Sequence, residues 1–250
     1  MYFCSNFTIM TVITPEQKLA DVILKNYNLI PVVNSFGIEL GFGDKTIKAI
    51  CTEHQIDAVF FSVLLNMINS ASYVIDKHIS ILNTNQLVDY LRRTLRNYKT
   101  SQISVIDIHI AQLMASSSDK NEHLQLIENF FSQFKIEFNQ YESDINNALY
   151  GVIESAYACF LQEKEYIFGL EYPDFELFRE RFYQLNEKLS DMKSLLIKYL
   201  SGSFDRRIRN AIIYIISRFE EDMHDSMRLQ YKLLKPMTKE MFDKIRIEHE

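Results

Sequence analysis

The stretch LQLIENFFSQFKIEFNQYESDINNALYGV, residues 124–152, carries the strongest structural signal in this chain. Its apolar residues recur in steps of three and four, which places them on one face of an α-helix. The resulting stripe consists of Leu124, Ile127, Phe131, Phe134, Phe138, Tyr141, Ile145, Ala148 and Val152. The stretch therefore predicts one long helix with a single buried face.

Three further segments repeat this period. From Thr84 onward the stripe is Leu87, Leu91, Leu95, Tyr98, Gln102, Ile106, His109 and Leu113. After residues 168–174 it is Phe175, Phe178, Phe182, Leu185, Leu189, Met192, Leu196 and Tyr199, and after residues 200–204 it is Ile208, Ile212, Ile215, Phe219, Met223, Ser226, Gln230 and Leu233. Four such helices joined by short breaks predict an up-down four-helix bundle in which neighbours run antiparallel.

The two hairpins of this bundle place certain residues at one height. If the first hairpin folds near residue 118, Leu95 and Tyr141 lie opposite each other. If the second folds near residue 204, Phe182 and Ser226 do likewise. The sequence therefore predicts that these four side chains share one level of the bundle.

The composition agrees with an all-α protein. The 250 residues include six Gly, four Pro and no Trp, so few tight turns interrupt the helical pattern. The net charge of -6 disfavours nucleic acid as a partner, because phosphate binding needs a basic face. No apolar run reaches the roughly 18 to 20 residues of a membrane-spanning helix. Since Cys4, Cys51 and Cys159 are too scattered for a disulfide framework, we expect a cytoplasmic protein.

Residues 1–83 predict a separate, small helical module. Thr14-Pro15-Glu16-Gln17 is a helix-start pattern, and it predicts a helix that continues to Asn26. Residues 44–55 and 57–70 predict two further helices. Residues 1–13 precede the first recognisable element, and we expect them to be disordered. The bundle then occupies residues 84–250.

The segment FGIELGFGDKTIKAIC, residues 36–51, holds three of the six glycines. Gly37 can follow a helix end with positive φ, and Gly41 and Gly43 allow a tight turn. Asp44 is then expected to cap the next helix. These residues predict a structural loop rather than a ligand contact.

A longer segment around this loop, LIPVVNSFGIELGFGDKTIKAICTEHQID, is similar to the N-terminal module of the repair-of-iron-centres proteins. The match is carried by Phe36-Gly37-Ile38, Gly41, Gly43 and residues 47–51. The resemblance implies that a hemerythrin-like four-helix bundle holding two irons follows the module. It also implies a role in iron–sulfur cluster repair or nitrosative-stress defence.

The sequence departs from that family at its functional positions. Many members carry two adjacent cysteines where this chain has Leu40 and Gly41, so the thiol chemistry of this loop is lost. The positions similar to the family's iron ligands are Leu95, Tyr141, Ile145, Phe182, Ser226 and Gln230. Iron of this type takes imidazole and carboxylate ligands, which none of these residues supplies. We therefore expect no metal and no cofactor at this vestigial site.

Other polar residues lie on the stripes. Gln102 and His109 are a candidate polar site for a small ligand, although a His in such a position is more often a core residue bonded to a neighbouring helix. Ser226 and Gln230 with Tyr141 form a polar island that binds either a ligand or a buried water.

Sequence motifs for catalysis are absent. The chain has no GxSxG, Walker loop, GxGxxG or HExxH pattern. The acidic run Glu220-Glu221-Asp222 lies beside the fourth stripe, and we interpret it as a solvated helix face. We therefore expect that the protein is not an enzyme.

The leading hypothesis is a metal-free, hemerythrin-like protein that acts by binding a protein partner or a small ligand. The alternative is a working di-iron protein of iron–sulfur repair. A transcription regulator is disfavoured because the sequence closes with DKIRIEHE, residues 243–250, which leaves no room for a helix-turn-helix domain after the bundle.

The N-terminal module also predicts self-association. LIPVV (29–33) and VFFSVLLNM (59–67) hold more apolar surface than three short helices can bury among themselves. Closed two-fold dimers are the commonest way to cover such surface. We therefore expect a homodimer to which residues from the first 80 contribute.

Overall fold

The computed structural model describes residues 12–75, 79–117, 122–162 and 170–249. Within these ranges the regular structure is helical, apart from one isolated β-bridge between Lys18 and Thr46. The prediction of an all-α fold is confirmed. The chain divides into two compact units, residues 1–83 and 84–250. Among the described helices, none is long and apolar enough to cross a membrane.

Short helices make up the first unit. They are α1 (Leu19–Lys25), η1 (Tyr27–Leu29), α2 (Ile30–Ser35), α3 (Ile47–Glu53), α4 (Ala58–Asn69) and η2 (Ile81–Asn83). Asp57 caps α4, because its Oδ1 accepts hydrogen bonds from the N–H groups of Val59 (2.8 Å) and Phe60 (2.9 Å). The ring of Phe36 meets those of Phe60 and Phe61 edge-on at 6.4 and 5.2 Å, so the loop after α2 is fixed to the core of this unit.

The start of the first unit differs from the prediction. The Thr14 N–H donates to Gln17 Oε1 at 3.3 Å within a turn, and the first helix begins only at Leu19. Ile13 is buried, and its N–H and C=O each form a 2.8 Å hydrogen bond with the side chain of Asn66. The expected disorder therefore does not extend to Ile13, because Asn66 satisfies its backbone. Residues 1–11, to which the same expectation applies, lie outside the described residues.

The glycine loop has the backbone that its sequence predicts. Gly37, Gly41 and Gly43 have φ angles of +73°, +107° and +65°, a region that favours glycine. Asp44, however, does not cap α3. Thr46 Oγ1 accepts from the Ala49 N–H at 3.2 Å, because Thr46 directly precedes the first helical residue. Asp44 pairs instead with Lys18 at 3.0 Å.

The apolar segments of the first unit are buried within the chain. Leu29, Val32 and Val33 are buried, and so are residues 60–67. The surplus apolar surface from which we expected a dimer is therefore not found in these segments. Val59, at 39% exposed, is the exception within these segments. Exposed large apolar side chains elsewhere in this unit include Leu24, Tyr27, Leu40 and Val74.

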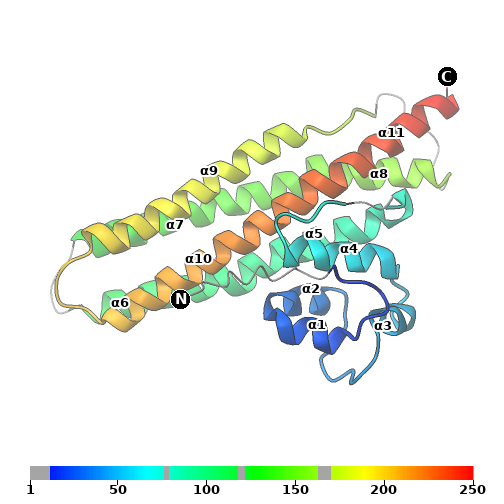
Figure 1. Ribbon diagram of the computed structural model, residues 1–250. Coiled ribbons are helices and arrows are strands. Elements are labelled where there is room, and N and C mark those ends of the chain that lie inside the picture. The colour runs from blue at the N-terminus through cyan, green and yellow to red at the C-terminus, as the bar shows by residue number, and fades with distance from the viewer. Residues whose placement is uncertain (1–11, 76–78, 118–121, 163–169, 250) are drawn as a thin grey trace, which may run out of the picture. The chain divides into compact units, whose positions relative to one another are not determined.

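The second unit contains four long helical segments (Figure 1). The first consists of α5 (Thr84–Asn97), η3 (Tyr98–Ile103) and α6 (Ser104–Ala115), and the second of α7 (Glu122–Asp144), η4 (Ile145–Tyr150) and α8 (Gly151–Phe160). The third consists of α9 (Phe175–Ser194) and η5 (Leu195–Tyr199), and the fourth of α10 (Arg206–Leu229), η6 (Gln230–Leu234) and α11 (Lys235–His249). Helices α6 and α9 each pack against both α7 and α10, and α8 packs against α11. The interior shared by the four segments is named the seam.

Each of the four segments contains a π-helical turn, η3 to η6. A π turn holds one residue more than an α turn, so the buried face moves by one position. The shift accounts for departures from the predicted stripes in and after η3, η4 and η5. Leu149 and Ile153 are buried in place of Ala148 and Val152, Leu200 in place of Tyr199, and Ile103 and Ile110 in place of Gln102 and His109. It does not account for α10, where Ile216 and Met227 are buried in place of Ile215 and Ser226 ahead of η6.

One level of the seam is filled by aromatic rings. Phe131 and Phe134 of α7 stack with centroids 5.8 Å apart, and Phe134 lies 6.0 Å from Phe138. Phe219 of α10 meets Phe134 and Phe138 edge-on at 6.2 and 6.3 Å. These four residues, each at most 1% exposed, are named the aromatic cluster.

Candidate functional site

A small cavity lies on the seam next to the aromatic cluster. Its volume is about 20 Å³, counted as space for the centre of a water molecule. It is lined by Leu91, Leu95, Tyr98, Phe138, Tyr141, Tyr150, Phe182, Met223, Ser226, Met227 and Gln230. These residues come from all four segments of the second unit, and the space is named the seam cavity.

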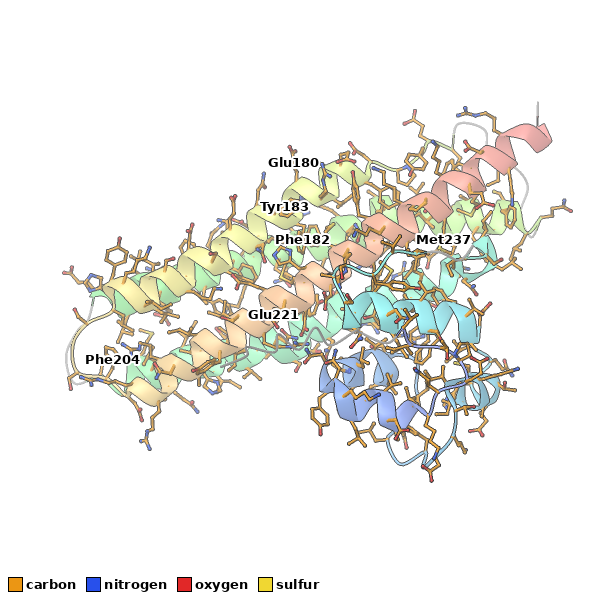
Figure 2. The ribbon with its side chains drawn as sticks, in the orientation of Figure 1. Glu180, Phe182, Tyr183, Phe204, Glu221 and Met237 are labelled. Carbon is orange, nitrogen blue, oxygen red and sulfur yellow. The ribbon has the colours of Figure 1, made fainter. Side chains whose placement is uncertain are left out.

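The seam cavity brings together five of the six vestigial positions, namely Leu95, Tyr141, Phe182, Ser226 and Gln230. Ile145 is buried at the start of η4 but does not line the cavity. Phe182 lies on α9 beside the exposed Tyr183 (Figure 2). The Phe182 ring meets the ring of His224 on α10 edge-on at 5.6 Å. The four residues that the hairpin spacing predicts at one height, Leu95, Tyr141, Phe182 and Ser226, thus line one cavity.

Three π turns contribute to the cavity at their ends. Tyr98 begins η3, Tyr150 ends η4 and Gln230 begins η6. Tyr150 was missed by the stripe analysis, because the helical period predicts Ala148 rather than Leu149 and Tyr150 on the buried face. π turns inside long helices are frequent at functional sites, which supports a role for this level of the seam.

Gln230 is a buried polar residue of the lining, with only 3% of its surface exposed. Its Oε1 accepts a hydrogen bond from the Tyr150 hydroxyl at 3.1 Å. Its Nε2 is buried and has no hydrogen-bond partner among the described residues. A single hydroxyl can serve only one end of the amide, so the other end still needs a partner.

The hydroxyls of Tyr98 and Ser226 form a second polar group on the lining. The Tyr98 hydroxyl lies 2.7 Å from Ser226 Oγ and donates to the Asp222 carbonyl oxygen at 2.6 Å. Burial raises the pKa of Tyr98 well above its usual value, and it also raises the pKa values of Tyr141 and Tyr150. All three phenols therefore stay protonated near neutral pH.

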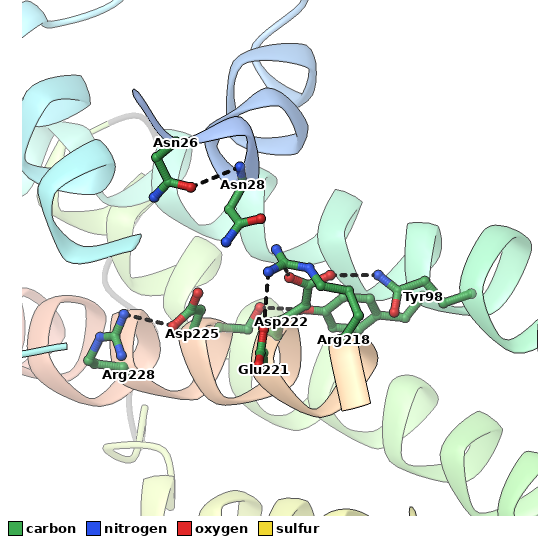
Figure 3. Close-up of polar contacts among 10 residues, drawn as sticks. Asn26, Asn28, Tyr98, Arg218, Glu221, Asp222, Asp225 and Arg228 are labelled. Atoms are coloured by element: carbon green, nitrogen blue, oxygen red, sulfur yellow. Dashed lines mark hydrogen bonds and ion pairs between the residues drawn. The ribbon is translucent and has the colours of Figure 1, made fainter. Parts of the chain in front are cut away.

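Carboxylates on α10 lie outside this lining and are paired (Figure 3). Asp222 accepts from Gln102 Nε2 at 2.8 Å and forms an ion pair with Arg218 at 2.5 Å. Asp225 pairs with Arg228 at 2.7 Å. Desolvation raises the pKa of both Asp222 and Asp225, and the arginines oppose this shift.

The acidic run 220–222 is therefore not the solvated helix face that we expected. Glu220 is buried and forms an ion pair with Lys193, and Asp222 is half-buried. Only Glu221 in this run is exposed, and it pairs with Arg218 at 3.2 Å. The prediction of a solvated face failed because these carboxylates are buried against partners that the stripe pattern does not show. Lys193 and Gln102 come from other segments, and Arg218 lies one turn away on α10.

Gln102 and His109 do not form a common polar site. Gln102 turns to Asp222, as described above, whereas His109 Nδ1 lies 2.8 Å from the Val105 carbonyl oxygen of its own helix. Sequence reasoning favoured a bond to a neighbouring helix for this His. The shift caused by η3 puts Ile110 in the buried position instead, so His109 is only half-buried.

The lining of the seam cavity does not fit a di-iron centre. Such centres take His and carboxylate ligands, and the lining residues include neither. Across the part of the chain that the structure describes, no group of three His, Cys, Asp or Glu side chains is placed to hold a metal ion. His224 follows the lining residue Met223, but it is exposed and pairs with Asn186 Nδ2 at 3.1 Å.

No protein-family model matches the sequence, and a comparison with curated proteins finds no similar chain. The likeness to repair-of-iron-centres proteins therefore depends on the motif in residues 29–57 and on the order of the two units. The geometry of the seam cavity is the remaining guide to function.

Proposed function

We propose that this chain is a metal-free relative of the hemerythrin-like repair-of-iron-centres proteins, and that it acts by binding rather than by catalysis. The observation that carries the proposal is the uncharged lining of the seam cavity. This lining occupies the level of the bundle at which the resemblance expects iron ligands. The six positions hold apolar or aromatic side chains, apart from the neutral polar Ser226 and Gln230.

The architecture supports the hemerythrin-like part of the proposal. Four long helical segments surround one seam. Helix α6 of the first segment and helix α9 of the third each pack against both α7 and α10. A small helical unit with the Phe36-Gly37-Ile38 turn precedes them. This is the order of parts that the resemblance implies.

The chemistry of the lining supports the metal-free part. Leu95 and Phe182 have no atoms that can bind a metal, and Gln230 is a neutral, weak ligand. The buried phenols stay protonated, so they do not supply anionic oxygen ligands. What remains is a neutral space in a helical scaffold, which suits the binding of an uncharged molecule.

Metal analysis of the full chain, purified from cells grown with added iron, tests this proposal. We expect no stoichiometric iron and no visible absorption, and we expect the same result for a portion treated with a chelator. A pair of irons per chain with the visible absorption of an oxo-bridged centre would contradict the proposal. That result would favour the alternative, a di-iron protein of iron–sulfur cluster repair.

Formation of a homodimer through the first unit remains a separate prediction. Leu24, Tyr27 and Val74 are each more than 60% exposed, and contact with a second copy would cover such side chains. Sedimentation equilibrium at micromolar concentration should then give twice the chain mass of 29.5 kDa. Leu24→Lys should shift the equilibrium towards monomer. A wild-type monomer under these conditions would refute the prediction.

A further inference from the structure

The amide nitrogen of Gln230 is a buried polar atom on the described lining that still needs a partner. The Tyr150 hydroxyl serves Oε1, and Nε2 has no partner among the described residues. Bulk water does not reach this amide, because Gln230 is buried. Native proteins commonly supply such a group with an enclosed hydrogen-bonding molecule.

The space beside this amide fits one small molecule. The seam cavity has a volume of about 20 Å³. A site needs roughly 10–15 Å³, measured in the same way, to hold a water molecule. One molecule of that size therefore fits with little room for a second.

The lining also selects against ions. It contains no acidic, basic or His side chain to compensate a charge. Moving an unpaired ion from water into such a space is strongly unfavourable. Leu91, Leu95 and Phe138 offer no hydrogen bonds, whereas Ser226 Oγ keeps an acceptor lone pair beyond its bond with Tyr98. The suitable occupant is neutral, accepts one hydrogen bond and can donate another.

We propose that the seam cavity is a binding site for one neutral, water-sized molecule held by Gln230 Nε2, and that water occupies it in the purified protein. The inference rests on the proposed function, because a seam that held iron would leave no such neutral space. The site gives the proposed binding role a definite ligand class.

Water–amide Overhauser contacts in the ¹⁵N-labelled full chain test the proposal directly. The side-chain amide protons of Gln230 should contact water with the sign typical of a long-lived, enclosed molecule. Gln133 is the matched control, since it is exposed on α7 and donates to Glu137 at 3.0 Å. Gln133 should contact only short-lived surface water.

A pair of variants gives a second measurement. Magnetic relaxation dispersion counts the long-lived water molecules bound to a protein. Gln230→Met removes the amide that holds the proposed water, so it should lower this count by one, whereas Gln133→Met should leave the count unchanged. An equal count for wild type and Gln230→Met, or a Gln230 amide without a long-lived water contact, would overturn the proposal.

Iron analysis of the same samples separates this proposal from the proposed function. An iron-free protein whose Gln230 amide contacts no long-lived water overturns only the ligand site. Iron in the seam overturns the metal-free function as well.

Discussion

The aromatic cluster and the seam cavity are neighbouring levels of one seam, and they are built in different ways. In the aromatic cluster four Phe rings meet at 5.8 to 6.3 Å and are fully buried. At the seam cavity polar side chains share the lining with Leu, Met and Phe, three π turns begin or end, and a space remains. Helices α7 and α10 therefore pack ring against ring at the aromatic cluster, whereas a space remains at the level where the π turns begin or end.

The largest effect is expected in the aromatic cluster. Phe134→Ala should lower the free energy of unfolding by about 3–5 kcal/mol, because it removes a ring with close neighbours on two helices. Ile136→Ala, at a 63% exposed position of the same helix, is the control and should change it by less than about 0.5 kcal/mol. Urea unfolding followed by circular dichroism measures both. Similar losses for the two variants would show that the cluster is not the core of the unit.

A smaller loss is expected at the seam cavity. Leu95→His and Phe182→His place a polar ring in a largely apolar lining, and each should cost about 1–3 kcal/mol. Tyr183→His is the matched control, because Tyr183 neighbours Phe182 on α9 and is 47% exposed (Figure 2). Equal melting temperatures for wild type and both cavity variants would contradict the burial of this level.

Much of the helical fold could be predicted from the sequence, because buried residues recur with the helical period. The same period could not locate the π turns, since one inserted residue leaves the pattern almost unchanged. Ala148 and Tyr199 were therefore expected inside, although Leu149 and Leu200 take these positions. These two errors lie at a π turn and reflect a local change of backbone rather than a wrong segment. On α10, ahead of η6, Ile216 is buried in place of Ile215 without such a turn.

The candidate site could be predicted in part. Hairpin spacing placed Leu95, Tyr141 and Phe182 at one level, because chain length alone fixes the height of residues in antiparallel neighbours. Partners between helices could not be predicted in this way. The bond from Tyr150 to Gln230 and the ion pair of Lys193 with Glu220 join residues that only the tertiary packing brings together.

The central claim is that no charged side chain lines the seam cavity, and Gln230→Glu tests it. The new carboxyl group keeps the shape of the side chain and the acceptor for Tyr150, but it is an anion when ionised. In a lining without a cation, burial should raise its pKa in the folded protein. The folded state then binds more protons than the unfolded state, so stability falls as pH rises above the unfolded value of about 4.3.

The measurement is the free energy of unfolding of Gln230→Glu relative to wild type between about pH 4 and pH 7, with Gln112→Glu at an exposed position of α6 as the control. We expect the deficit of Gln230→Glu to be small at the acid end and to widen steadily towards neutral pH, whereas that of Gln112→Glu, which has no acidic side chain one turn away on its helix, stays nearly constant. A Gln230→Glu deficit that stays constant or shrinks as pH rises would reveal a positive charge or a bound metal ion in the seam and would contradict the account.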